Sequence, residues 1–200
     1  MRKYNPNINH PKKGRRIRVE PIRRRKDITS IKRLLESRPR DHLLFVMGIN
    51  NGLRVGDLLK LKVSDVDRLK PGQTITIQEG KTGKENILMV NKAVHKAIKN
   101  FLEETQPESD EFLFASQKGR GPLTIQTVNA MIKRWARAIN LRENYGAHTL
   151  RKTFGYIQRT KFGVGFEVLA KRYNHSSPAV TMRYLGISSD EVNECLMHEI

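Results

Sequence analysis

The chain has 200 residues, and its 38 Lys and Arg against 20 Asp and Glu give a formal net charge of +18, which predicts a polyanionic partner. This length suits one domain with an appended arm, and the single Cys195 excludes an internal disulfide and a thiolate cluster for zinc. The longest apolar run, residues 43–49, is too short to cross a bilayer, so we expect a soluble, non-secreted protein.

The first 27 residues are strongly basic and are expected to form an arm. Residues 1–40 hold 15 Lys or Arg and 3 Asp or Glu, and prolines interrupt the run. Such segments are usually disordered when free and neutralise phosphates when bound, although a tail that only solubilises is the alternative. The residues expected to contact the phosphates of such a partner are Lys12, Lys13, Arg15, Arg16, Arg23, Arg24 and Arg25, together with Lys84 further along the chain.

Helix signals follow the arm. Asp27 or Thr29 is expected to cap a first helix, and Pro39 begins a second helix that stops at Gly52. A short helix is expected from Val55 to Lys60. This order places an arginine, Arg54, directly after a helix end.

A basic hairpin comes next. Residues 74–78 and 86–90 are predicted to be strands around a turn at 79–85 that contains two lysines and two glutamates. Asn91 and Thr124 then cap two helices whose apolar residues recur at core-type spacing.

Three further helices complete the prediction. They are expected from Ala147 to about Thr160, from Phe166 to Tyr173, and from Pro178 onward. The element count favours a mainly α domain with a small antiparallel β-sheet (α+β) over the alternating pattern of a doubly wound fold.

A set of phosphate-binding and nucleophilic residue types occurs at defined spacings. Gly52-Leu53-Arg54 precedes the hairpin, a histidine and an arginine lie three residues apart in the sixth predicted helix, and a second histidine is followed nine residues later by a tyrosine. This order resembles the tyrosine recombinase (phage integrase) family over about residues 28–190. The resemblance implies that family's catalytic-domain fold and an active set of Arg54, Lys81, His148, Arg151, His175 and Tyr184.

The resemblance also implies a function. It predicts a site-specific DNA recombinase or integrase whose Tyr184 attacks one strand to leave a 3′-phosphotyrosine link, with no cofactor, metal ion, ATP or small-molecule substrate. The partners implied are double-stranded DNA and three further copies, as a homotetramer on DNA, in the cytoplasm of a bacterial, archaeal or phage-host cell, with no membrane partner. The expected division is an arm at 1–27, a catalytic domain at 28–185 and a tail at 186–200, exchanged between protomers or docked on its own domain.

Elementary chemistry gives each residue a role. Arg54 and Arg151 can each present a planar fork to the non-bridging oxygens of a phosphate, and Asp57 can orient the first of them or cap local amides. His148 can accept the tyrosine proton or donate to the phosphate, and His175 can donate to a non-bridging oxygen. The two histidines have no carboxylate or thiolate companions of the kind that metal sites use.

Two lysines compete for one role in the hairpin. Lys81 is placed to protonate the 5′ oxygen as it leaves, with Lys84 as its rival. The string Gly80-Lys81-Thr82 is not a nucleotide-binding P-loop, because position 75 is Ile where that motif needs Gly and a strand follows in place of a helix.

Two departures from the family pattern keep alternatives open. Asn174 stands where the family usually has Gly, a substitution that a left-handed backbone tolerates. The helical core-binding half that usually precedes the catalytic half is expected to be absent. The alternatives are a type IB-like DNA topoisomerase, a catalytically silent DNA-binding regulator that keeps the fold, and, more weakly, a basic RNA-binding protein, although aromatic residues make up only 6% of the chain.

Overall fold

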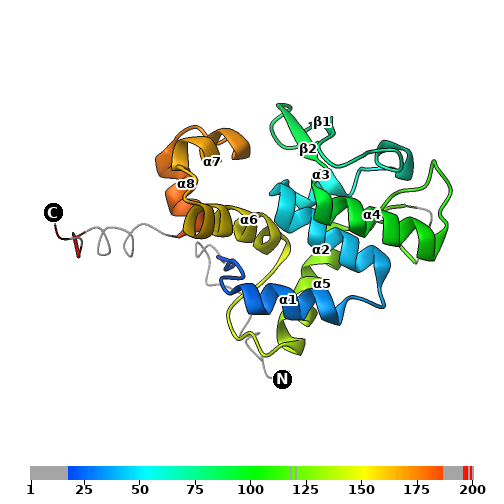
Figure 1. Ribbon diagram of the computed structural model, residues 1–200, viewed down its shortest axis with the longest axis horizontal. Helices are drawn as coiled ribbons and strands as arrows, with labels where there is room; N and C mark the ends of the chain where they lie inside the picture. The colour runs from blue at the N-terminus through cyan, green and yellow to red at the C-terminus, as the bar shows by residue number, and fades with distance from the viewer. Residues whose placement is uncertain (1–17, 118, 120, 187–195, 198, 200) are drawn as a thin grey trace, which may run out of the picture.

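The computed structural model describes residues 18–117, 119, 121–186, 196, 197 and 199 (Figure 1). Its described part is mostly helical with a two-stranded antiparallel sheet, which confirms the predicted fold class. In chain order the elements are α1 (Arg25–Leu34), α2 (Pro39–Asn51), α3 (Val55–Leu58), the 3-10 turn η1 (Val63–Asp65), β1 (Thr74–Gln78), β2 (Glu85–Met89), α4 (Lys92–Thr105), α5 (Ile125–Ala138), α6 (Ala147–Phe162), α7 (Phe166–Tyr173) and α8 (Pro178–Leu185).

Three predicted capping residues lie at helix ends as expected: Asn91 precedes α4, Thr124 precedes α5 and Gly52 follows α2. Asn91 accepts a hydrogen bond from the backbone N–H of Val94 at 2.9 Å, and the Thr124 hydroxyl accepts one from Thr127 at 3.1 Å. Gly52 ends α2 with φ of 60°, a left-handed conformation that glycine adopts without strain. Local sequence therefore sets the ends of the helices that border the site.

Helix α1 differs from the prediction at its start. It begins at Arg25, before the expected caps Asp27 and Thr29, and neither caps it. The Asp27 carboxylate instead accepts a hydrogen bond from Nε of Arg24 at 2.8 Å. An arginine that faces the first turn has drawn this carboxylate away from the backbone amides.

The hairpin also differs from the prediction, by one residue. Strand β2 begins at Glu85, which pairs with Gln78, so the turn comprises residues 79–84. Val90 lies just beyond the strand, although its N–H still donates to the carbonyl of Gln73 at 2.9 Å. The shift leaves Lys81 near the middle of the turn.

Residues 18–24 pack against the domain, although the prediction placed them in the arm. Ile22 is buried, and its N–H donates to the Thr153 hydroxyl on α6 at 2.9 Å. The N–H of Glu20 donates to the carbonyl of Asn144 at 2.8 Å. The arm boundary at residue 27 is therefore wrong for this segment. The arm residues Lys12, Lys13, Arg15 and Arg16 lie outside the described residues, as do residues 187–195, 198 and 200 of the predicted tail.

Two apolar clusters hold the described residues together. The main cluster joins α2, α4, α5 and the start of α6, and includes Phe45 edge-on to Trp135 with ring centroids 6.2 Å apart. A smaller cluster unites α7 and α8 through Phe166, Tyr173 and Leu185. In Figure 1, α7 and α8 lie together beside α6, while the hairpin stands on the other half of the molecule above α3. No helix among the described residues is long and apolar enough to span a membrane.

Candidate active site

Four of the six predicted active residues line one pocket. Arg54 at the start of α3, Lys81 in the hairpin turn, and His148 and Arg151 on α6 surround a cavity of about 480 Å³. Helix α6 brings the last two together because residues three apart share one helical face. The rival Lys84 does not line this pocket. The fold thus collects three cationic side chains and a histidine from three separate elements.

Arg151 is held by backbone carbonyls. Its side chain is only 2% exposed, and its Nη1 and Nη2 donate to the carbonyls of Gly52 and Tyr173, each at 2.8 Å. Its guanidinium carbon lies 4.4 Å from the centroid of the Tyr173 ring. A guanidinium has five N–H donors, so these two bonds leave others for a ligand in the pocket. The arginine ties the end of α2 to the end of α7 while facing the cavity.

Arg54 pairs with a carboxylate that the sequence analysis did not single out. Its Nη1 lies 2.5 Å from Oε2 of Glu79, whose side chain is fully buried. Of the two roles expected for Asp57, capping an amide is confirmed, because Oδ1 accepts from the N–H of Gly80 at 2.8 Å. The carboxylate that contacts the Arg54 guanidinium is that of Glu79 and not that of Asp57. An acidic residue in a charged turn gave no periodic signal that pointed to it.

Tyr184 and His175 form a ring cluster with Tyr173, whose ring also contacts Arg151. The Tyr184 ring is edge-on to His175 and to Tyr173, with centroids 5.3 and 5.7 Å apart. Its hydroxyl is buried and has no hydrogen-bond partner among the described residues. Burial raises the pKa of Tyr184 to about 12, against the opposing effect of Arg151 and Arg54. Neither Tyr184 nor His175 lines the pocket, but the two arginines whose charges act on the phenol do line it.

Both histidines are neutral near pH 7. Burial, followed by the positive charges of Arg151 and Arg54, lowers the pKa of His175 to about 4. Burial and then Arg151 and Lys81 lower the pKa of His148 below its usual 6.5. A neutral imidazole has one donor and one acceptor nitrogen. Nδ1 of His175 shares a hydrogen bond of 2.9 Å with the hydroxyl of Thr181, which leaves its other nitrogen for the site.

The depressed pKa of His175 predicts how stability depends on pH. Between about pH 6.5 and 4 the unfolded chain binds a proton at this residue that the folded chain does not, so the free energy of unfolding should fall as pH is lowered through this window. Urea unfolding of the unchanged protein and of His175→Gln at several pH values measures this. We expect a shallower decline for the variant. Equal slopes would contradict the burial of a neutral imidazole.

Lys152 was also missed by the sequence analysis. It follows Arg151 directly and is only 3% exposed, and its ammonium has no hydrogen-bond partner among the described residues. The ammonium lies 5.2 Å from the centroid of the Tyr184 ring. Burial, and then the charge of Arg18, lowers the pKa of Lys152 to about 8. A basic residue next to another on a helix is normally solvated, so the sequence held no sign of this burial.

The described basic residues that are expected to bind DNA, namely Arg23, Arg24, Arg25 and Lys84, do not line the pocket. Arg23 pairs with Glu20 at 3.0 Å and Arg24 with Asp27 at 2.8 Å, and Arg25 is exposed at the start of α1. Exposed ion pairs of this kind contribute only about 0.2–1 kcal/mol, so they do not prevent these arginines from contacting phosphates. Their role in DNA binding stays a prediction.

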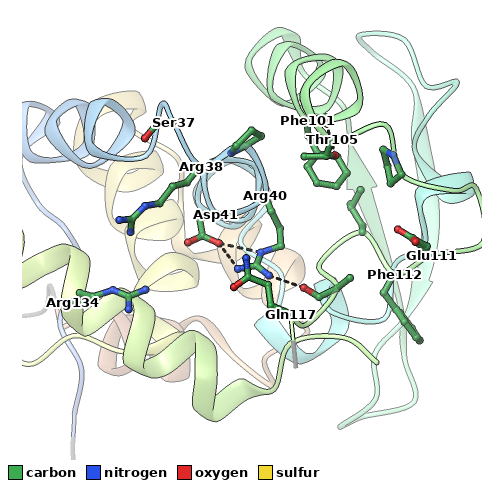
Figure 2. A pocket seen from close by; sticks show the side chains of 14 residues that line it. Ser37, Arg38, Arg40, Asp41, Phe101, Thr105, Glu111, Phe112, Gln117 and Arg134 are labelled. Carbon is green, nitrogen blue, oxygen red and sulfur yellow. Dashed lines mark hydrogen bonds and ion pairs between the residues drawn. The ribbon is translucent and has the colours of Figure 1, made fainter. Parts of the chain in front are cut away.

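A second cavity, of about 630 Å³, contains none of the predicted active residues (Figure 2). Arg40 contacts the Asp41 carboxylate at 2.9 Å and donates to the carbonyl of Ala115 at 2.7 Å, while Arg38 and Arg134 line the wall. Chemistry and not volume therefore identifies the candidate site. No group of three or more His, Cys, Asp or Glu residues among those described is arranged to hold a metal ion.

The domain is helical, and its basic hairpin and two arginines meet near a tyrosine on the last described helix, α8. This is the arrangement of a tyrosine recombinase catalytic domain. Residues 24–191 match the family model described as "Phage integrase family", and the chain belongs to this family. It is 37% identical over 175 residues to the probable integrase/recombinase YoeC of Bacillus subtilis (strain 168), covering 86% of this chain and 92% of that protein.

Other relatives are longer. The chain is 27% identical over 174 residues to the tyrosine recombinase XerC of Caldanaerobacter subterraneus subsp. tengcongensis, covering 82% of this chain but 48% of that protein. Among solved structures, the XerA recombinase superposes with a TM-score of 0.72 at 20% identity, covering 90% of this chain and 67% of that one. XerH bound to palindromic difH substrate superposes with a TM-score of 0.70 at 26% identity, covering 86% and 49%. The chain thus spans about half the length of several relatives that it matches.

Proposed function

We propose that this protein cuts and rejoins DNA strands at specific sites through a covalent ester between Tyr184 and a 3′ phosphate. The convergence of Arg54, Lys81, His148 and Arg151 on one pocket carries the proposal, because the pocket offers a phosphate charge neutralisation, a proton donor and a proton acceptor together. Family membership and the XerH neighbour solved on its DNA substrate support it.

In the proposed reaction the phenolic oxygen of Tyr184 attacks the phosphorus of one phosphodiester. His148 accepts the phenolic proton, and Lys81 gives a proton to the 5′ oxygen as its bond to phosphorus breaks. Arg54, Arg151 and His175 stabilise the negative charge on the non-bridging oxygens. The ester keeps the bond energy, so the 5′ hydroxyl of a second strand can reverse the step.

The buried hydroxyl of Tyr184 sets a condition on this reaction. A phenol with a pKa of about 12 is a poor nucleophile near pH 7, and its hydroxyl does not line the pocket. A phosphate bound between Arg54 and Arg151 would partly neutralise the charges that now lower this pKa, so the reaction needs a base close to the phenol. We therefore expect α8 to shift toward the pocket when DNA binds, with His148 taking the proton.

The proposed partners are double-stranded DNA and further copies of the chain as a homotetramer on DNA. A lambda integrase tetramer bound to a Holliday junction superposes with a TM-score of 0.61 at 21% identity, which compares the fold alone. The exchange of residues 186–200 between protomers stays a prediction. Nicked duplex DNA incubated with the protein, followed by denaturing electrophoresis, tests the central proposal by revealing or failing to reveal a covalent adduct.

The arm should supply much of the DNA affinity. Residues 1–17 contain six Lys or Arg, and each phosphate neutralised contributes about 0.9 to the slope of log affinity against log salt. A truncation that begins at residue 18 keeps the segment packed on α6, and we expect it to weaken binding and reduce the slope by at most about 5. Fluorescence anisotropy at several salt concentrations measures both. An unchanged slope would show that the arm does not contact phosphates.

The two hairpin lysines can be separated by the leaving group. We expect Lys81→Ala to slow cleavage by about 10²- to 10⁴-fold, as for loss of a general acid. Replacing the 5′ bridging oxygen by sulfur should restore much of the rate, because a thiolate leaves without being protonated. Lys84→Ala is the matched control: loss of its expected DNA contact should weaken binding only, so at saturating DNA it should cleave both substrates at the normal single-turnover rate. If Lys84→Ala instead showed the larger loss of rate, and the 5′-sulfur substrate restored it, Lys84 and not Lys81 would be the general acid.

The two alternatives make different predictions in the same assay. A topoisomerase would form the adduct but relax supercoiled DNA without joining different strands. A silent regulator would bind DNA and form no adduct, and the buried, unpartnered hydroxyl of Tyr184 is the observation that favours it. Strand exchange between two labelled duplexes separates all three.

A further inference from the structure

Glu79 is a buried carboxylate at the centre of the candidate site. It follows the last residue of β1 in an otherwise exposed turn, yet its side chain has no exposed surface. A buried charge is costly unless it is paired and hydrogen-bonded. The partners of this carboxylate therefore indicate why it is there.

Each oxygen of this carboxylate has a partner. Oε2 contacts Nη1 of Arg54 at 2.5 Å and accepts from the Thr82 hydroxyl at 2.6 Å, while Oε1 accepts from Nδ2 of Asn86 at 2.9 Å. Burial tends to raise the pKa of Glu79, but the hydrogen bonds from Thr82, Asn86 and Arg54 outweigh it and hold the pKa at about 2. The group is thus ionised at every pH at which the enzyme would work.

The same residue also closes the turn that carries Lys81. Its N–H donates to the carbonyl of Lys84 at 2.9 Å, and its carbonyl accepts from Gly83 at 2.8 Å. Backbone and side chain of one residue therefore hold two different elements, the hairpin tip and the start of α3.

Asn86 extends this network to α7. Its Oδ1 accepts from Nη1 of Arg172 at 2.7 Å, and Nε of Arg172 donates to the carbonyl of Asn51 at the end of α2 at 2.9 Å. The carboxylate is consequently connected to the helices on both sides of Arg151, without lining the pocket itself.

We propose that Glu79 is a positioning residue that holds the Arg54 guanidinium and the Lys81 turn in the register needed to grip the scissile phosphate. It does not touch DNA, and it acts through the two cations that do. This inference rests on the proposed function. It adds to that function a carboxylate that offsets part of the positive charge of Arg54 but holds its guanidinium in the correct orientation.

The variant Glu79→Gln tests the proposal. A glutamine amide has only one acceptor oxygen, so it can accept from Thr82 or from Asn86 but not from both through separate oxygens. Its NH₂ group would face the Arg54 guanidinium, and two donors cannot form a hydrogen bond with each other. We expect single-turnover adduct formation to slow by about 10- to 100-fold, the range typical of lost outer-shell partners. DNA affinity should not fall. The slowing should be constant from pH 6 to 9.

Glu85→Gln is the matched control, because it removes one negative charge from the same hairpin at an exposed position. It should cleave like the unchanged protein. Cleavage by Glu79→Gln at the rate of Glu85→Gln would overturn this inference alone, whereas no adduct from the unchanged protein would overturn the proposed function and this inference with it.

A second variant covers the case in which Glu79→Gln does not fold, as judged by its melting curve. Thr82→Val removes one hydrogen bond from the carboxylate, together with the 3.3 Å bond that the Thr82 hydroxyl accepts from the N–H of Lys84, at an exposed position. We expect a smaller slowing with unchanged affinity and melting temperature. A folded Thr82→Val variant that cleaves at the normal rate, where Glu79→Gln is unfolded, would show that the carboxylate serves stability and not positioning.

Discussion

Replacement of Tyr184 by Phe is expected to abolish the covalent DNA adduct, with a loss of at least about 10⁴-fold in the rate of its formation, as for removal of a catalytic nucleophile. The hydroxyl is the only group removed, and it has no hydrogen-bond partner among the described residues. The phenyl ring keeps its contacts with His175 and Tyr173. DNA affinity and the melting temperature should therefore be unchanged, or the latter slightly raised, because a buried polar group without a partner is costly.

Tyr145→Phe is the matched control for this experiment. Tyr145 is also buried, but its hydroxyl donates to the Glu143 carboxylate at 2.7 Å and it does not line the pocket. The control should form adduct at the normal rate on nicked duplex DNA. An adduct that persists in Tyr184→Phe would identify another nucleophile, and peptide mapping of the DNA-linked fragment would locate it.

Replacement of Arg151 by Lys is expected to impair both catalysis and folding. A lysine keeps the charge but cannot donate to the carbonyls of Gly52 and Tyr173 in the fixed geometry of a guanidinium. We expect adduct formation to slow by about 10²- to 10³-fold, the loss typical of one oxyanion donor. The melting temperature should also fall, because a buried carbonyl left without a donor costs about 1–3 kcal/mol.

The two effects of this change are measured separately. Calorimetry reports the melting temperature, and the single-turnover rate is taken well below it so that the variant is folded. Arg137→Lys, at an exposed position near the end of α5, is the control and should alter neither quantity. Normal cleavage by a folded Arg151→Lys variant would show that this arginine serves packing alone.

Features of short range were predictable. The caps Asn91 and Thr124 and the stop at Gly52 depend on a side chain and backbone amides a few residues away, so the sequence that forms each helix end also reveals it. Asn174 adopts the left-handed conformation, with φ of 53°, that its replacement of glycine requires. The errors at α1 and β2 were small and arose where an arginine or a strand partner competed with the local signal.

Features that join distant segments were not predictable from residues alone. Nothing local distinguishes Glu79 from a solvated turn residue, and only the packing of the hairpin over α3 buries it against Arg54. Residues 18–24 appeared to continue a basic arm, yet one apolar side chain, Ile22, seats them against α6. The burial of Lys152 beside the Tyr184 ring has the same origin.

By itself the sequence determined which kinds of side chain are present, in what order and on which helices or turns, because those properties depend on spacing and on neighbours along the chain. The tertiary structure alone decided that Arg54, Lys81, His148 and Arg151 share one cavity, while the buried hydroxyl of Tyr184 lies outside its lining. Contacts across the fold arise from packing between elements, and the resulting burial lowers the pKa of His148 and His175 and raises that of Tyr184.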